Sequence, residues 1–401
     1  MIFGKDEVVV KFNFDERIDR TGRGQAKWEP EILERLFGDR DLLSFWVADM
    51  DFRVAPPIRE ALVEAVEHGC MGYTSLDKSF YDAYINWQKR RNGWEPSVDW
   101  FRYTPGVVPA INLLLLSITE EGDEVLIQRP VYYPFTDSIV KQKRVVVSSA
   151  LINEGGKYTI DFEDFEKKAA SPKCKAFVMS NPHNPVGRVF TEEELRKIGE
   201  ICNKHGVFVI SDEIHSDLIA KGHKHVVYAS LGKEFEQNCA ICHAPSKTFN
   251  LAGLQLSCIL IPNEEARAKF DAIQNRYSIT SPNYFAPVAA KAAWNKGEEW
   301  LEACYDYMYE NYKYIVDFCA AHWDGKVIVS PLEGTYLAWL DFRAIESDPE
   351  KLLNMVRKEG KVALDEGYIF GPEGAGFERI NLACPKSLIV ELMDRLVKFV
   401  K

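Results

Sequence analysis

The sequence predicts an α/β fold in which a mostly parallel sheet is covered by helices on both faces. Through the middle of the 401-residue chain, short apolar runs alternate with helical patterns, an order that is typical of βαβ units. The apolar runs are too continuous for half-exposed strands, which indicates a sheet buried on both faces. The chain is long enough for two or three domains, and its 46% apolar content can fill them.

The first 50 residues predict an irregular arm, with an amphipathic helix near 30–37 and a short apolar strand at 45–52 that two carboxylates interrupt. Two helices should follow. Pro56-Pro57 opens the first, because proline fits an initial helical turn, and glycines close it after about residue 68. Gly72-Tyr73-Thr74 is then an exposed turn, and the second helix runs from about 79 to 91.

The clearest βαβ unit lies further along the chain. Its strands are 176–180 and 207–210, and its helix begins with a capping box of Thr191 and Glu194 and ends at Gly206. The other elements expected in this region are strands at 100–103, 124–128, 239–242 and 257–261 and a helix at 107–118.

After about residue 290 longer helical stretches predict a smaller α+β domain. The elements expected there are helices at 298–321, 349–359 and 387–400 and a strand pair at 326–329 and 336–340. We therefore divide the chain into an arm at 1–50 that packs with the small domain, a large domain at 51–290 and the small domain at 291–401.

Charge and cysteine content exclude several classes of function. A formal net charge of −11 without a block of Lys or Arg argues against a nucleic-acid partner. No apolar run approaches the length of a membrane span, and the amino terminus lacks a signal-peptide pattern, so we expect a cytoplasmic protein with no membrane partner. Nine cysteines are scattered through apolar segments, and Cys239 and Cys242 lack a second pair at zinc-site spacing, so we expect no metal site.

Candidate binding residues follow the predicted strands, at the sheet edge where open parallel sheets bind ligands. The N–H groups of Gly106-Val107-Val108, at a helix start, suit a phosphate. Tyr132 can stack on an aromatic ring, Asn184 is presented by a loop with two Asn-Pro steps, and Asp212 ends an apolar strand. Taken singly, each has an ordinary alternative, such as a plain turn, a core tyrosine or a helix cap.

Lys247 is the candidate residue that connects the others to a single ligand. It stands after the apolar strand at 239–242, and an apolar pocket lowers the pKa of a lysine so that its neutral amine can form a Schiff base. A lone lysine in a loop is usually a surface residue. A phosphate seat, a stacking ring, a buried carboxylate and a Schiff-base lysine are, however, what pyridoxal phosphate requires. Asp212 and Lys247 are 35 residues apart, which lets the chain return to the same edge.

Longer motifs make the assignment more specific. Asn181-Pro-His-Asn-Pro-Val-Gly187, Ser211-Asp-Glu-Ile-His215 and Ser246-Lys-Thr-Phe-Asn250 resemble fold type I pyridoxal-phosphate enzymes of the class I/II aminotransferase family. The resemblance covers nearly the full chain and implies a seven-stranded sheet in the large domain. Three further motifs resemble the MalY/PatB branch, the cystathionine beta-lyases or C–S lyases: Val47-Ala-Asp-Met-Asp-Phe52, Gly334-Thr-Tyr-Leu-Ala-Trp-Leu-Asp341 and Gly376-Phe-Glu-Arg-Ile-Asn-Leu-Ala-Cys-Pro385.

The resemblance implies a role for each candidate residue. Lys247 would form the Schiff base and carry protons, and Asp212 would pair with the ring nitrogen. Tyr132 would stack on the ring and belong with these two to the catalytic group. Asn184 would bind the ring hydroxyl and lie near the substrate, and His215 occupies a position where transaminases of the family often have a tyrosine.

The resemblance also implies how the phosphate and the substrate are held. Gly106-Val107-Val108 and Ser246 would bind the phosphate of the same subunit. Tyr73 would reach the phosphate of the neighbouring subunit, which implies a homodimer. Arg379 would grip the substrate carboxylate as a bidentate fork, beside Ala48.

Two positions depart from the broader family pattern. Gln255 stands where many relatives have a phosphate-binding arginine, and Ala244 stands where a serine is common. We therefore expect neutral dipoles to hold the phosphate more than charge does.

The resemblance implies α,β-elimination on an L-amino acid with sulfur at its β carbon, such as L-cystathionine or a cysteine S-conjugate, to pyruvate, ammonia and a thiol. An aminotransferase for a neutral or aromatic L-amino acid is the first alternative, since acidic substrates would usually want a second cation. A non-catalytic regulator that keeps the fold is the second. Such regulators often carry a basic DNA-binding module, and the acidic arm offers no such segment.

Overall fold

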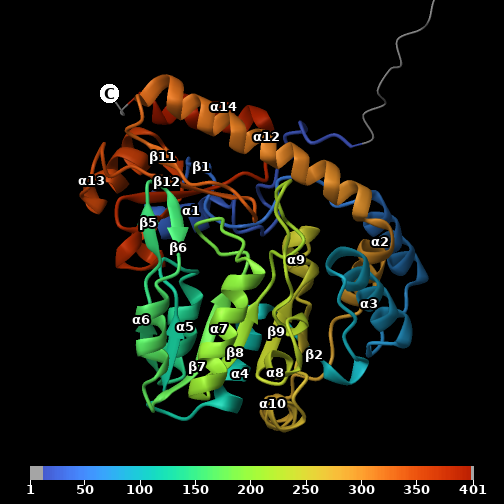
Figure 1. Cartoon of the computed structure of the whole chain (residues 1–401). Coiled ribbons are helices and arrows are strands. Elements are labelled where there is room, and N and C mark those ends of the chain that lie inside the picture. The colour runs from blue at the N-terminus through green and yellow to red at the C-terminus, as the bar shows by residue number, and fades with distance from the viewer. Residues whose placement is uncertain (1–11, 399–401) are drawn as a thin grey trace, which may run out of the picture.

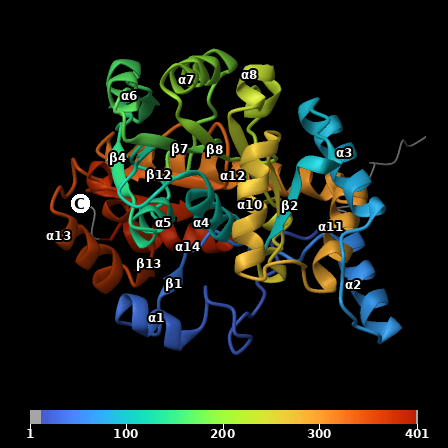
Figure 2. The same cartoon turned by 90° about the horizontal axis from the view of Figure 1, so that it is seen from below.

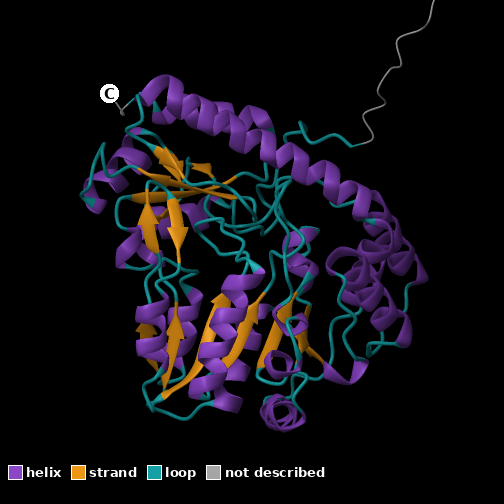
Figure 3. Ribbon diagram, in the orientation of Figure 1, coloured by secondary structure: helices purple, strands orange, loops and turns teal. Residues whose placement is uncertain are grey.

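The computed structural model describes residues 12–398, and its largest feature is a seven-stranded sheet (Figures 1 and 3). The strand order across the sheet is β2-β10-β9-β8-β7-β3-β4. All neighbouring pairs are parallel except those of β10, which is antiparallel to both β2 and β9. The prediction of a mostly parallel sheet is confirmed. The strands are β2 (Phe101–Thr104), β3 (Glu124–Ile127), β4 (Val145–Ser148), β7 (Cys174–Ser180), β8 (Phe208–Asp212), β9 (Cys239–His243) and β10 (Ser257–Leu260).

Helices cover both faces of this sheet, as Figure 2 shows from below. On one face lie α6 (Phe162–Ala169), α7 (Glu192–His205) and α8 (Lys233–Glu236), and on the other lie α4 (Val107–Ile118), α5 (Pro134–Lys141) and α10 (Glu264–Arg276). Successive strand residues alternate between the two cores, so that Val209 packs in one and Ile210 in the other. Cys239 and Cys242 divide in the same way and therefore do not face a common site.

The predicted capping box is present at the start of α7. The Glu194 N–H donates to Thr191 Oγ1 at 3.2 Å, and the Thr191 N–H donates to a Glu194 carboxylate oxygen at 2.8 Å. Helix α7 ends at Gly206, whose φ of +67° favours glycine. These local signals explain why the βαβ unit could be located from sequence.

A four-stranded antiparallel sheet, in the order β11-β12-β15-β14, lies above the carboxyl ends of the large sheet (Figure 1). Its strands are β11 (Ile328–Val329), β12 (Leu337–Asp341), β14 (Asp365–Glu366) and β15 (Phe377–Asn381). The helices that accompany it are α12 (Glu298–Trp323), α13 (Pro349–Asn354) and α14 (Lys386–Leu396). In the arm, β1 (Leu43–Ser44) pairs in parallel with β13 (Val362–Ala363). The domain boundaries near 50 and 290 stay predictions.

The remaining elements connect these parts. They are α1 (Pro30–Phe37), α2 (Pro56–His68), α3 (Lys78–Asn92), α9 (Pro245–Thr248), α11 (Phe285–Lys296) and the hairpin β5 (Ile152–Glu154) and β6 (Lys157–Thr159). None of the helices within residues 12–398 has the length and apolar character needed to cross a membrane.

The structure differs from the sequence predictions in three places. The strand predicted at 45–52 is wrong: β1 ends at Ser44, and the segment 45–52 that follows is irregular. Its backbone bonds to scattered partners rather than along one strand, since the Phe45 N–H donates to the Ala363 carbonyl and the Asp51 N–H to the Ala383 carbonyl, both at 2.8 Å. Asn381 Nδ2 donates to the carbonyls of Val47 and Asp49 at 2.7 and 2.6 Å. The helix predicted at 349–359 ends at Asn354 and continues as a π-helical turn. Helix α14 ends at Leu396, and the predicted end at Val400 lies outside the described residues.

Candidate active site

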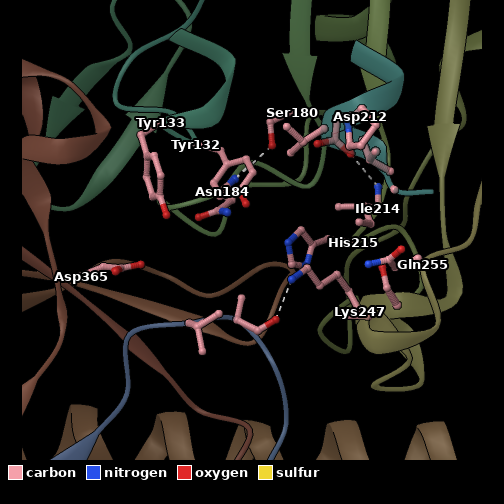
Figure 4. A pocket seen from close by; sticks show the side chains of 18 of the residues that line it. Tyr132, Tyr133, Ser180, Asn184, Asp212, Ile214, His215, Lys247, Gln255 and Asp365 are labelled. Carbon is pink, nitrogen blue, oxygen red and sulfur yellow. Dashed lines mark hydrogen bonds between the residues drawn. The ribbon is translucent and has the colours of Figure 1, made fainter. Parts of the chain in front are cut away.

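The carboxyl ends of the large-sheet strands, the arm and the small sheet enclose a cavity of about 220 Å³ (Figure 4). Of the predicted site residues, only Tyr73 lies outside it. The predicted residues that line the cavity are Ala48, Gly106, Val107, Val108, Tyr132, Asn184, Asp212, His215, Ser246, Lys247 and Arg379. Segments that are distant in sequence are thus brought together as the strand-end rule predicts.

Lys247 is carried by the short helix α9, directly after β9. Its Nζ atom donates to the carbonyl oxygen of Ala48 at 2.6 Å, and that oxygen also accepts from Tyr336 Oη at 3.0 Å. The pKa of Lys247 is lowered from 10.5 to about 8, chiefly by loss of surrounding water and also by the positive charge of Arg379, while Asp49 and Asp212 oppose the shift. The neutral amine, which is the nucleophilic form, is therefore accessible near neutral pH.

Asp212 is the last residue of β8, and it is buried and lines the cavity. One hydrogen bond reaches this carboxyl within residues 12–398, from the Ile214 N–H at 3.1 Å. Burial raises the pKa of Asp212 from 3.8 to about 7, against the effects of that hydrogen bond and of Lys247. A buried carboxylate with so few donors has room for a further cationic partner.

Arg379 extends from β15 into the cavity, where its guanidinium group is almost completely buried. Nη1 donates to Asn184 Oδ1 at 2.9 Å, and Nη2 donates to the Trp46 carbonyl at 2.8 Å and also to Asp365. The Phe370 ring lies 4.9 Å from the guanidinium carbon. Nε has no hydrogen-bond partner in the part of the chain that the structure describes, so Arg379 retains donor capacity for a ligand.

Tyr132 and His215 contribute rings that stay uncharged. Burial raises the pKa of the Tyr132 phenol well above 10, so it remains protonated. Burial lowers the pKa of His215 well below 6.5, and the positive charges of Lys247 and Arg379 act in the same direction. The His215 ring is 5.9 Å from that of Tyr336, and its Nδ1 lacks a partner among the described residues.

The groups that are predicted to bind the phosphate are neutral. Val107 and Val108 occupy the first turn of α4, where N–H groups lack intrahelical acceptors, and Gly106 precedes them with a φ of +152° that favours glycine. Ser246 and Gln255 also line the cavity. Within the described residues, Lys247 and Arg379 are the only lysine and arginine that line the cavity.

Among the cavity-lining residues that sequence reasoning did not assign to the site are Trp46, Tyr133 and Asp365. Tyr133 adjoins the predicted Tyr132 and could have been included by proximity. Trp46 adjoins the Val47–Phe52 motif. Asp365 lies in a strand of two residues, and no local pattern pointed to it.

Tyr73 lies on the loop between α2 and α3, and its side chain is fully exposed. It does not line the cavity of its own chain. Its expected contact with a neighbouring subunit therefore stays a prediction.

The chain matches known proteins over almost its whole length. The family model for aminotransferase class I and II covers residues 40–396. Cystathionine beta-lyase PatB of Bacillus subtilis is 42% identical over 384 residues, which are 96% of this chain and 98% of that protein. Protein MalY of Escherichia coli K12 is 33% identical, over 97% of this chain and 99% of that protein.

A solved structure agrees with these matches. The structure of cystalysin from Treponema denticola, which contains pyridoxal 5'-phosphate, superposes with a TM-score of 0.93 at 35% identity, over 96% of this chain and 98% of that one. Together with the cavity that joins Lys247, Asp212 and Arg379, these matches establish that the chain belongs to the aminotransferase class I and II family.

Proposed function

We propose that this protein is a pyridoxal-phosphate-dependent C–S β-lyase. It eliminates a thiol from an L-amino acid with sulfur at the β carbon, such as L-cystathionine or a cysteine S-conjugate, and the products are pyruvate, ammonia and the thiol. The observation that carries the proposal is one cavity that holds a low-pKa lysine, a buried carboxylate and an arginine with a spare donor. Relatives named as cystathionine beta-lyases support the reaction type.

The residues present fit pyridoxal phosphate. Asp212 accepts one hydrogen bond within residues 12–398 and would receive another from a protonated ring nitrogen. The first turn of α4 and Ser246 would hold the phosphate, and Tyr132 would cover the ring. When bound, the cofactor supplies an electron sink for the charge that develops at the substrate's α carbon.

The protein's own residues would then divide the work of the elimination. Arg379 binds the substrate carboxylate and, with Asn184, fixes the α carbon next to Lys247. The neutral amine of Lys247 takes the proton from the α carbon as a general base. Asp212 holds a negative charge opposite the ring nitrogen and so keeps that nitrogen protonated.

The second half of the reaction uses the same lysine. The bond between the β carbon and sulfur breaks, the sulfur leaves with the bonding electrons, and Lys247 returns its proton to the thiolate. The enamine that is released hydrolyses in water to pyruvate and ammonia. The Ala48 carbonyl, 2.6 Å from Lys247 Nζ, keeps the amine directed into the cavity between these two proton transfers.

An aminotransferase is the alternative, because the matching family is named for transamination. Removal of the α proton is the first proton transfer in both transamination and elimination. A neutral or aromatic amino acid would be its substrate. A regulator without catalytic activity is disfavoured, since Lys247, Asp212, Asn184 and Arg379 all line one cavity. The proposal includes a homodimer in which Tyr73 completes the neighbouring site, and a cytoplasmic location.

The test uses the purified, cofactor-loaded protein with L-cystathionine and no keto acid. Continuous pyruvate formation over many turnovers, with the absorbance spectrum of the cofactor restored after each addition, is the result expected for a lyase. Conversion that stops after one equivalent and resumes when a keto acid is added would make the protein an aminotransferase.

Lys247→Ala is the matched control for this test. It should retain pyridoxal phosphate through Asp212 and the phosphate-binding groups but lose turnover almost completely, because the base is absent. Absorbance and fluorescence of the bound cofactor report retention, and pyruvate release reports turnover. Ordinary activity in this variant would contradict the proposal.

A further inference from the structure

Asp365 is a charged group in the cavity that the proposed mechanism does not use. Two acidic residues, Asp212 and Asp365, and two basic ones, Lys247 and Arg379, line the cavity in the part of the chain that the structure describes. In the proposed mechanism, Asp212 pairs with the ring nitrogen of the cofactor, and Lys247 transfers protons. Arg379 and Asp365 therefore set the charge that a substrate meets.

The fold places these two residues directly against each other. Asp365 on β14 and Arg379 on β15 are partners in the antiparallel ladder, and an Asp365 carboxylate oxygen accepts from Arg379 Nη2. Their side chains are only 6% and 2% exposed. A buried pair of this kind keeps its geometry because separation would leave two unpaired charges.

The pair limits how much negative charge the cavity can accept. Arg379 already pairs with the carboxylate of Asp365, and the α-carboxylate of the substrate would be its second anionic partner. The remaining polar groups nearby cannot supply a further positive charge, because His215 is neutral and Tyr132 and Tyr133 remain phenols. A third carboxylate, on the side chain of a substrate, would be buried without a counter-charge.

We propose that Asp365 is a specificity-determining residue that pairs with Arg379 and thereby excludes amino acids with an uncompensated side-chain carboxylate. This inference rests on the proposed function and narrows its substrate class. L-Amino acids with neutral side chains are accepted. The distal end of cystathionine is also accepted, because its carboxylate is accompanied by an ammonium group. Aspartate and glutamate are rejected.

The experiment measures binding without turnover. Amino acids with a methyl group at the α carbon have no α proton, so they can change the cofactor's absorbance spectrum but cannot undergo elimination or transamination. α-Methyl-L-aspartate and 2-aminoisobutyrate are titrated into the cofactor-loaded wild type and the Asp365→Asn variant. The ratio of their two dissociation constants is the quantity compared.

In Asp365→Asn, we expect the dissociation constant of α-methyl-L-aspartate to fall by about tenfold or more, because Arg379 no longer pairs with a protein carboxylate and can compensate the ligand's side-chain charge, while that of 2-aminoisobutyrate changes by less than about threefold. Asp365→Glu keeps the charge and should keep the rejection. An unchanged ratio of the two dissociation constants would overturn the inference. If both ligands bound more weakly by the same factor, Asp365 would only position Arg379.

Two further variants complete the experiment, one as a substitute if Asp365→Asn does not fold and one as a matched control. Asp365→Ser can still accept from Arg379 and serves if Asp365→Asn does not fold. Glu366→Gln is the matched control, because Glu366 is also buried on β14 but pairs with Arg357 at 2.6 Å and does not line the cavity. Its ratio should equal that of the wild type. A wild type that gives no absorbance change with 2-aminoisobutyrate would contradict the proposed function itself, and the inference with it.

Discussion

Asp212 illustrates how a single residue couples the site to stability. Its pKa rises from 3.8 to about 7 on burial, so between about pH 4 and pH 7 the folded, cofactor-free protein keeps a proton that the unfolded chain loses. The folded state binds more protons in this window, and its stability therefore falls as the pH rises through it. A protonated ring nitrogen would offset this cost.

We predict that Asp212→Asn stabilises the cofactor-free protein at pH 7 by about 1 kcal/mol or more, because a costly buried charge is removed. The gain over wild type should shrink at pH 4. Thermal melting of both proteins without cofactor, at several pH values, provides the measurement. The same variant should lose several orders of magnitude in turnover with cofactor bound. A wild type that is the more stable of the two at pH 7 would argue against the assigned ionisation.

Gln255 is the second residue with a clear expectation. It lines the cavity, in which the described residues offer the expected phosphate dipoles but no lysine or arginine apart from Lys247 and Arg379. Gln255→Arg should tighten cofactor binding by roughly tenfold, because a charge-assisted hydrogen bond to phosphate is stronger than a neutral one. Equilibrium dialysis against pyridoxal phosphate measures the change. Gln255→Met, which is similar in size but uncharged, should not bind more tightly than wild type.

At the scale of elements, the arm is held by a buried ion cluster. Asp51 accepts from Lys27 Nζ at 2.7 Å, Trp28 Nε1 at 2.7 Å and Arg20 Nη1 at 2.5 Å. Arg20 also binds Asp49. These contacts fix the irregular segment that holds Ala48 against Lys247, so the arm contributes to the active site through its backbone.

We predict that Asp51→Asn lowers the free energy of unfolding by about 3–5 kcal/mol, because Lys27 is left buried with a weakened counter-charge. Denaturation in urea, followed by tryptophan fluorescence, measures the effect. Glu16→Gln is the control on the same arm, since its pair with Arg53 is exposed and its loss should leave the midpoint nearly unchanged. Equal midpoints for the two variants would contradict the role of the cluster.

Sequence patterns located the elements and most of the site because both depend on local signals. Parallel strands end at one edge, so residues after β3, β7, β8 and β9 could be assigned to one cavity without coordinates. The place of Asp365 in the cavity and the pairing of β10 with β2 depend on contacts between segments far apart in sequence. A strand of two residues, such as β14, has no periodicity to recognise. The ion cluster of the arm could not be predicted either, because its residues lie in irregular segments without periodicity.

At the scale of the whole molecule, the exposed position of Tyr73 leads to a test of subunit exchange. If Tyr73 serves the neighbouring site, then Tyr73→Ala and Lys247→Ala disable different subunits' contributions to one site. A heterodimer of these variants contains one site with both native residues. Co-expression should therefore restore about a quarter of the wild-type activity when subunits pair at random.

The control for this experiment mixes Lys247→Ala with Asp212→Ala. These residues line the cavity of the same chain, so no heterodimer of the two contains an intact site. Activity should remain as low as in either variant alone. Restored activity in the control, or none in the Tyr73 mixture, would refute the expected sharing of sites.

The oxygen that contacts Lys247 belongs to the backbone of Ala48, and no side-chain replacement deletes it. A scan that truncates each cavity side chain in turn would pass over this atom. Its position is encoded by Asn381, Asn250 and Tyr336, which hold the segment around Ala48 through hydrogen bonds to its backbone. A redesign that keeps Lys247 should therefore also keep these three side chains, because they set the position of the carbonyl that Lys247 contacts.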